Sequence, residues 1–199
     1  MSSRNAILEK VKAAQPSVVY TLPETIQKAL EGDAFLRFGT VLESIGGKVE
    51  RLEENEPIAE KVVALFPEAK RIVSAITSVE AYFLAEYRSL LHHSLKDVDV
   101  AIIQASFGVA ENGAVWVTEE DLKIRVLPFI CEHLIALLPA KDIVPTMHEA
   151  YERIGAADYH FGVFIAGPSK TADIEQSLVL GAHGPKSMTV LLVDDHSTF

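Results

Sequence analysis

Polar and turn-forming residues are concentrated in a short stretch near the end of the chain, between two apolar runs. Residues 167–175 read GPSKTADIE, and residues 181–185 read GAHGP. Hydroxyl, ammonium and imidazole groups bind small anions and transfer protons. This stretch therefore predicts a ligand site, in which Ser169, Lys170 and Thr171 line one loop.

His183 is the residue of this stretch best suited to proton transfer. Gly181 and Gly184 lie close on either side of it, so the backbone can turn sharply and expose the imidazole. An exposed His183 would serve as a proton donor or as the partner of a carboxylate. A structural or solvated loop histidine explains the same pattern, and both interpretations stay open.

A second candidate site lies in mid-chain, where residues 110–113 read AENG. Asn-Gly favours a type I′ hairpin turn, because both central residues need positive φ. Asn112 and Gly113 then either make only a turn, or hold Glu111 at a strand end beside a crevice. Burial there would raise the pKa of Glu111 and suit it to proton transfer or nucleophilic attack.

Two acids follow the lysine loop, at the predicted start of a helix over residues 173–180. Asp173 and Glu175 would place negative charge in its first turn, where they neutralise the helix dipole that a phosphate uses. They would cap the helix or hold a cation. Lys170 and Thr171 would remain available for a small carboxylate.

The elements that must position these residues alternate between apolar strands and amphipathic helices. Crossover connections between parallel strands are right-handed, so this alternation predicts an α/β fold, a mostly parallel sheet with helices on both faces and a small antiparallel hairpin insertion near Asn112. The loop at 167–171 would then leave the carboxyl end of a parallel strand, where ligands bind. We expect one domain over residues 1–199, with residues 1–30 as a helical N-terminal extension. Predicted strands cover residues 48–52, 71–76, 99–105, 134–138, 159–166 and 187–193, and predicted helices cover residues 3–14, 24–31, 34–45, 58–66, 147–154 and 173–180.

Composition narrows the classes of partner. The 18 Lys and Arg against 28 Asp and Glu give a net charge of −10, which repels nucleic acids and anionic membrane surfaces. No apolar run is long enough to insert into a membrane, so a cytoplasmic protein is expected. Cys131 is the only cysteine, so the chain cannot build an iron–sulfur cluster by itself. Nucleotide loops, zinc-protease motifs and serine-hydrolase motifs are missing from the sequence, and no metal is expected.

Three segments resemble one family. Residues 167–185 (GPSKTADIEQSLVLGAHGP), 97–117 (DVDVAIIQASFGVAENGAVWV) and 125–139 (RVLPFICEHLIALLP) are similar to lactate-utilisation (LUD) domains of the LutC/YkgG type. The resemblance implies an architecture like that of the NagB/RpiA/CoA-transferase group. Arg125 and His133 match family positions. Arg125 suits bidentate recognition of a carboxylate, although a structural ion pair is the favoured alternative.

The resemblance implies an auxiliary role in the oxidation of L-lactate to pyruvate by a cytoplasmic iron–sulfur system. The clusters would lie on partner subunits, and this chain would bind no cofactor. Residues 110–113 also resemble the Ser-Glu-Asn-Gly motif of class I CoA transferases, with Ala110 in place of serine. The alternatives are therefore a stand-alone CoA or acyl transferase that uses Glu111, or a small-carboxylate-binding protein.

Overall fold

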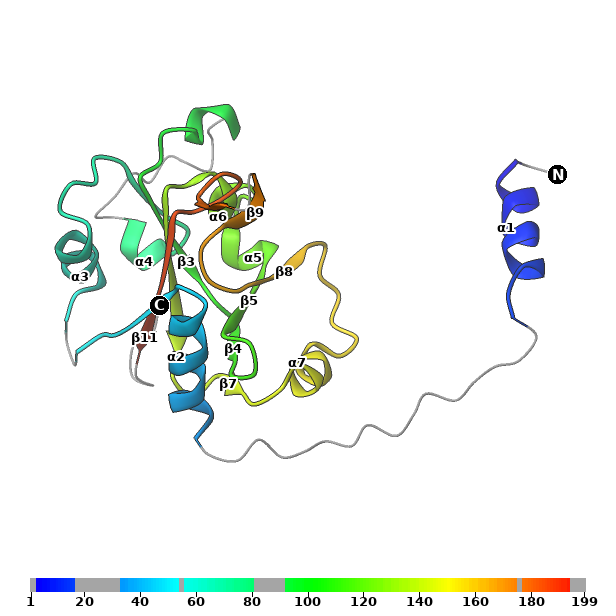
Figure 1. The fold of residues 1–199 in the computed structure, drawn as a ribbon, viewed down its shortest axis with the longest axis horizontal. Coiled ribbons are helices and arrows are strands. Elements are labelled where there is room, and N and C mark those ends of the chain that lie inside the picture. The colour runs from blue at the N-terminus through cyan, green and yellow to red at the C-terminus, as the bar shows by residue number, and fades with distance from the viewer. Residues whose placement is uncertain (1–2, 17–32, 54–55, 81–91, 175–176, 194–199) are drawn as a thin grey trace.

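The computed structural model describes residues 3–16, 33–53, 56–80, 92–174 and 177–193. Helices and strands alternate between residues 34 and 104, whereas several strands follow one another directly in the second half of the chain (Figure 1). The helices are α1 (Ser3–Ala13), α2 (Ala34–Ser44), α3 (Ile58–Leu65), α4 (Thr77–Glu80), the 3-10 helix η2 (His92–Leu95), α5 (Glu119–Leu122), α6 (Leu127–Ile130) and α7 (Met147–Ile154). The strands are β1 (Lys48–Arg51), β2 (Ile72–Ser74), β3 (Val100–Gln104), β4 (Phe107–Val109), β5 (Ala114–Thr118), β6 (His133–Pro139), β7 (Ile143–Val144), β8 (Gly162–Ile165), β9 (Lys170–Ile174), β10 (Ser177–Leu180) and β11 (Ser187–Val193).

A five-stranded sheet in the order β1-β11-β6-β3-β2 forms the centre of the fold, and all its pairs are parallel. Its middle strands are apolar on both faces. In β6, Leu134 and Ala136 enter one core cluster while Ile135 and Leu137 enter the other. Both faces of the sheet therefore need cover, as is usual for parallel sheets.

Helices supply this cover on both faces, as predicted. Val62 of α3 packs with Ile135 and Leu137 on one face. On the other face, Phe38 and Leu42 of α2 enter the larger cluster. The side chain of Asp33 accepts a hydrogen bond from the Phe35 N–H (2.9 Å) and so caps the start of α2.

The predicted hairpin insertion is present, and it is part of a larger second sheet. The order is β7-β4-β5-β8, in which β5 is antiparallel to both of its neighbours. Val115 and Val117 point into the main core, whereas Phe107 and Trp116 pack on α7 in a separate cluster. The second sheet therefore lies between α2 and α7 (Figure 1).

The predicted helix over residues 173–180 is wrong, because the structure has an antiparallel hairpin of β9 and β10 there. Thr171 lies opposite Val179, and the Gly181 N–H donates to the Ser169 carbonyl (3.0 Å). β-Branched residues and this hydrogen bond favour the extended chain over the weak helical spacing. Asp173 therefore lies in a strand, its side chain is outside the described part of the structure, and Glu175 is outside the described residues.

Two further expectations about turns are also wrong. β8 is antiparallel to β5, so the loop at 167–171 does not leave the carboxyl end of a parallel strand. In the 110–113 turn only Gly113 has positive φ (67°), which excludes a type I′ turn. Asn112 instead stabilises the turn through its side-chain oxygen, which accepts from the Ala114 N–H (3.0 Å).

The N-terminal expectations are met in part. α1 forms where predicted, and none of its residues is buried. The predicted helix at 24–31 lies outside the described residues.

Replacement of Gly113 should test the packing of the second sheet on α2. A Cβ at Gly113 would lie 2.8 Å from both Cα and N of Leu42, and the backbone φ there is +67°. We expect Gly113→Ala to lower the free energy of unfolding by about 2–4 kcal/mol, from backbone strain plus overpacking. Urea unfolding measures this loss.

Gly39→Ala is the matched control, since a Cβ there would meet only Val49 Cγ2 at 3.9 Å. Gly39 lies inside α2, so alanine should raise stability by about 0.5–1 kcal/mol. Equal effects of the two substitutions would contradict the close approach of the 110–113 turn to α2.

Candidate functional site

The two predicted loops near the end of the chain are in direct contact. The Ser169 N–H donates to the Pro185 carbonyl (2.9 Å), and the Gly181 N–H donates to the Ser169 carbonyl (3.0 Å). A Cβ at Gly184 would lie 3.2 Å from Ser169 Cβ. The segments 167–171 and 181–185 thus form one surface, with Ser169 at their junction.

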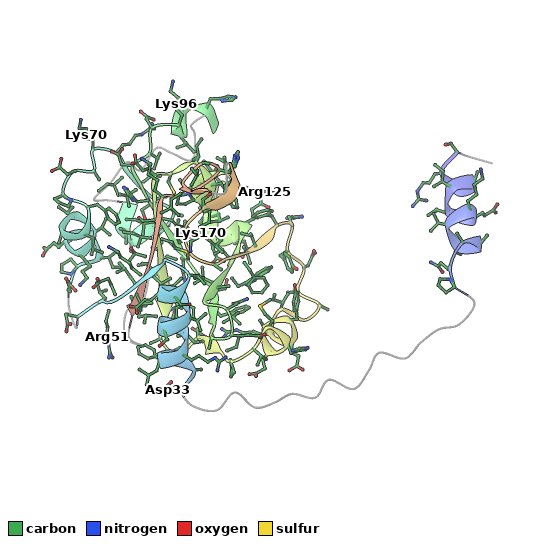
Figure 2. The ribbon with its side chains drawn as sticks, viewed as in Figure 1. Asp33, Arg51, Lys70, Lys96, Arg125 and Lys170 are labelled. Carbon is green, nitrogen blue, oxygen red and sulfur yellow. The ribbon has the colours of Figure 1, made fainter. Side chains whose placement is uncertain are left out.

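Lys170 lies beside the C-terminal end of α2 and far from Asp33 at the start of that helix (Figure 2). Its Nζ is 3.2 Å from the position that a Cβ at Gly46 would take. Gly167 packs equally closely on Ile45, because a Cβ at Gly167 would lie 3.1 Å from the Ile45 carbonyl oxygen. The partial negative charge of a helix C-terminus is favourable for a nearby ammonium, and Lys170 lies in such a position.

His183 is exposed and lines a cavity of about 450 Å³. This cavity is at the edge where the parallel strands begin, because its other residues precede β3, β6 and β11. Figure 2 shows Lys96 at this end of the molecule and Arg51, the last residue of β1, toward the other end. Its charged lining residues besides His183 are Lys96, Asp97, Asp99, Glu132 and Lys186.

Most of these charges are satisfied within the protein. Lys186 Nζ donates to Glu132 Oε1 (2.6 Å), and this hydrogen bond lowers the pKa of Glu132. Asp99 accepts from the backbone N–H groups of Arg71 and Lys70 (2.8 and 2.7 Å), which lowers the pKa of Asp99. These two carboxylates are therefore ionised at neutral pH.

The remaining acid of the lining, Asp97, pairs with Arg71. Within the described part of the chain, no ion pair is seen for Lys96. Among the described residues, Lys96 and His183 are consequently the two lining side chains that remain as hydrogen-bond donors for a ligand. The charged lining was not predicted from the sequence, because its residues come from three distant segments. The signal that marks it is a charged residue just before each buried strand.

His133 is the first residue of β6 and belongs to the same edge of the sheet. Its Nδ1 is 2.7 Å from Ser187 Oγ, and its ring packs on Phe66 with centroids 4.8 Å apart. Burial is the main cause that lowers the pKa of His133. The neutral imidazole links the first residues of β6 and β11.

Arg125 forms a structural ion pair, which was the favoured alternative to recognition of a carboxylate ligand. Its Nε and one terminal nitrogen donate to the two oxygens of Glu119 (3.0 and 2.8 Å), and its guanidinium lies over the Phe161 ring. This bidentate pair uses the donors that a carboxylate ligand would need. Arg125 therefore joins α5 to the segment before β8.

Glu111 is exposed, and its carboxylate faces α7. Its Oε2 accepts from the N–H of Met147, the first residue of that helix (2.8 Å), where negative charge is favourable. Among the described residues, no hydrogen bond or ion pair joins Glu111 to the loops at 167–171 and 181–185. Thr171 is half-buried on β9, next to Lys170.

Cys131 does not suit a cluster ligand in this fold. It is buried in the main core, and desolvation raises its pKa to about 12. A cluster ligand must be an accessible thiolate. In the described ranges, no group of three or more His, Cys, Asp or Glu side chains could hold a metal, and no helix is long and apolar enough to cross a membrane.

Comparison with known proteins gives one matching family and several named relatives. The profile of the LUD domain matches residues 60–193. Lactate utilization protein C 1 of Bacillus mycoides (strain KBAB4) is 35% identical over 106 residues, which are 50% of this chain and 45% of that protein. Lactate utilization protein C of Oceanobacillus iheyensis is 33% identical over 103 residues, 48% of this chain and 44% of that protein. The match thus spans less than half the length of these curated relatives.

One solved structure is also similar. The crystal structure of a DUF162 family protein from Deinococcus radiodurans matches with a TM-score of 0.61, covering 80% of this chain and 96% of that chain. The sequences are 16% identical, so this likeness concerns the fold alone. It confirms the α/β class with a mostly parallel sheet.

The lowered pKa of His133 predicts a pH dependence of stability. The unfolded chain takes up this proton near the ordinary pKa of 6.5, whereas the folded protein takes it up only at lower pH. The stabilisation that comes from neutral His133 is therefore complete above the pKa of the unfolded chain. The free energy of unfolding should fall as pH drops from about 7 to 5. Urea unfolding at several pH values measures this slope.

His133→Asn should flatten the slope, because asparagine can still contact Ser187 but does not titrate. His148→Asn, at an exposed histidine of α7, should keep the slope of the parent protein. Asp99 and Glu132 act in a separate window, below their ordinary pKa values of 3.8 and 4.5. A slope unchanged by His133→Asn would contradict the assignment to His133.

Proposed function

The chain belongs to the LUD domain family, and from this we propose that it is an auxiliary, ligand-binding component of a lactate-utilisation system. The observation that carries the proposal is the cavity of His183, where Lys96 and His183 remain for a ligand after the other charges are paired. The ligand is a small carboxylate of the lactate or pyruvate type. The relatives named lactate utilization protein C support the choice of substrate class.

The chemistry of the cavity fits recognition of a carboxylate. An ammonium and an imidazole give charge-assisted hydrogen bonds to carboxylate oxygens, which are stronger than neutral ones. The acids of the lining are held by Lys186, Arg71 and backbone N–H groups, so they repel the ligand less than free carboxylates would. A hydroxyl or keto group beside the carboxylate would lie near the ring of His183, which can donate or accept.

Oxidation of the ligand is assigned to partner subunits. Lactate oxidation needs an electron acceptor, and in this proposal iron–sulfur clusters on partner chains accept the electrons. The only cysteine of this chain, Cys131, is buried and protonated at neutral pH. The burial of Cys131 supports the proposal that this chain binds the carboxylate, while its partner subunits transfer the electrons.

The alternative of a CoA or acyl transferase depends on Glu111. A nucleophilic carboxylate must be free to attack, yet Glu111 accepts a hydrogen bond at the start of α7. This contact favours a structural role for Glu111. The auxiliary role is therefore the better supported of the two functions.

Thermal denaturation with L-lactate, pyruvate or acetate tests the binding role. A ligand that binds only the folded chain raises its melting temperature by mass action, so lactate or pyruvate should raise it more than acetate. His183→Gln and Lys96→Gln should each weaken binding about tenfold, the usual effect of losing a charge-assisted hydrogen bond. The matched controls are His148→Gln and Lys12→Gln, on α7 and α1.

Two results would contradict the proposal. One is equal melting shifts in the parent protein and in both cavity variants. The other is transfer of CoA between carboxylic acids by the purified chain, lost in Glu111→Gln, which would establish the transferase alternative instead.

A further inference from the structure

A second large cavity lies away from the proposed carboxylate site. It has a volume of about 810 Å³, between the outer face of the second sheet and residues 157–160. None of the residues discussed above as predicted site residues lines it. Cavities of this size hold ligands as large as cofactors.

One wall of the cavity is aromatic. Tyr159 is 42% exposed and meets Trp116 edge-on, with ring centroids 5.4 Å apart. The ring of Trp116 lies close against Gly162 of β8, because a Cβ at Gly162 would come within 2.4 Å of its Cη2 and Cζ2 atoms. Both rings line the cavity, and Tyr159 offers a surface on which a planar ring can stack.

The cationic part of the lining comes from Arg153 and Lys123. The guanidinium of Arg153 lies 4.9 Å from the centre of the Phe107 ring and donates to Asp142 (2.6 Å). These two contacts fix the guanidinium and leave other N–H groups for a ligand, since arginine has five. For Lys123, no ion pair is seen within the described ranges.

The backbone at Lys123 is strained. Its φ is 59° and its ψ is −37°, and the Ile124 N–H donates to the Leu122 carbonyl (2.6 Å). This is a γ-turn with positive φ, which is rare and unfavourable for a residue with a side chain. Among the described residues, Lys123 is the only one besides glycines with positive φ. This unfavourable backbone conformation therefore belongs to a lysine of the cavity lining.

The acids of the lining limit the charge of the ligand. Three acids line the cavity: Glu119, which pairs with Arg125, and Glu120 and Asp158, for which no ion pair is seen among the residues that the structure describes. They repel a highly charged anion but accept hydrogen bonds from hydroxyl groups. A suitable ligand therefore combines a planar ring, hydroxyl groups and one compact anionic group.

We propose that this cavity binds a nucleoside monophosphate. The base stacks on Tyr159, the ribose hydroxyls donate to Glu120 and Asp158, and the phosphate lies between Lys123 and Arg153. No glycine-rich phosphate loop is needed, because these two side chains supply the charge. The site is separate from the cavity of His183, so it can be tested without assuming the proposed function.

Fluorescence titration gives a direct test, because Trp116 is the only tryptophan of the chain. With excitation at about 295 nm, AMP should produce a saturable change in emission. Adenosine should bind at least tenfold more weakly, since it lacks the phosphate. ATP should also bind more weakly than AMP, because the lining carries three acids and, among the described residues, only Glu119 is paired, with Arg125. Inorganic phosphate should produce no saturable change.

Single substitutions locate the site. Tyr159→Ala should weaken AMP binding about tenfold, as loss of one stacking ring does. Tyr151→Ala is the matched control, because Tyr151 is also exposed and edge-on to a ring, Phe164, but does not line the cavity. It should change affinity less than twofold. Calorimetry checks both variants independently of Trp116 emission.

Two substitutions of Lys123 separate the effect of its charge on AMP binding from the effect of its backbone conformation on stability. Lys123→Gln should weaken AMP binding about tenfold and leave adenosine binding unchanged. Lys123→Gly should weaken AMP binding to the same extent and raise the melting temperature, because glycine relieves the positive φ. The proposal is overturned if AMP gives no saturable response, if phosphate alone binds as well as AMP, or if Tyr159→Ala and Lys123→Gln bind AMP like the parent protein.

Discussion

The parallel pairing of β6 with β11 is the interaction on which the rest of the structure depends. Seven register pairs join these strands, from Ser187 opposite His133 to Val193 opposite Pro139. Their side chains are buried on both faces, so both layers of helices and the second sheet pack against them. The same register aligns the segments that precede the strands, which brings Glu132 and Lys186 together and forms the cavity of His183.

The sequence predicts most of the parallel sheet and several helices. In these segments the apolar periodicity agrees with the positions of the glycine and proline residues that end helices and strands. β11 has its predicted bounds, and α2 (Ala34–Ser44) follows the helix predicted over residues 34–45 to within one residue. Residues 173–180 were mispredicted because short apolar spacing fits a helix and a strand equally, and a tertiary hydrogen bond from Gly181 decides between them. The strand β4 was not predicted, because three residues are too few to show the alternation of apolar and polar side chains that is typical of a strand.

The candidate site was predictable only where its parts are close in sequence. Ser169 and the 181–185 loop are neighbours through a short hairpin, and they do touch. Lys96, Glu132 and Lys186 come together only through the strand order, which one sequence does not contain. Arg125 and Glu111 show the converse limit: residue type suggests chemistry, but nearby partners, Glu119 and the start of α7, already occupy their polar atoms.

The strand order also bears on how the protein is made. β1 pairs with β11, so residues 48–51 find their partners only at 189–192. As the chain leaves the ribosome, β1 has no strand to pair with until β11, the last of the described strands, is synthesised. β11 then takes its place between β1 and β6. Such long-range closure slows folding and leaves apolar edges open to solvent in the nascent chain. Dependence on chaperones during synthesis is the expected consequence of this topology.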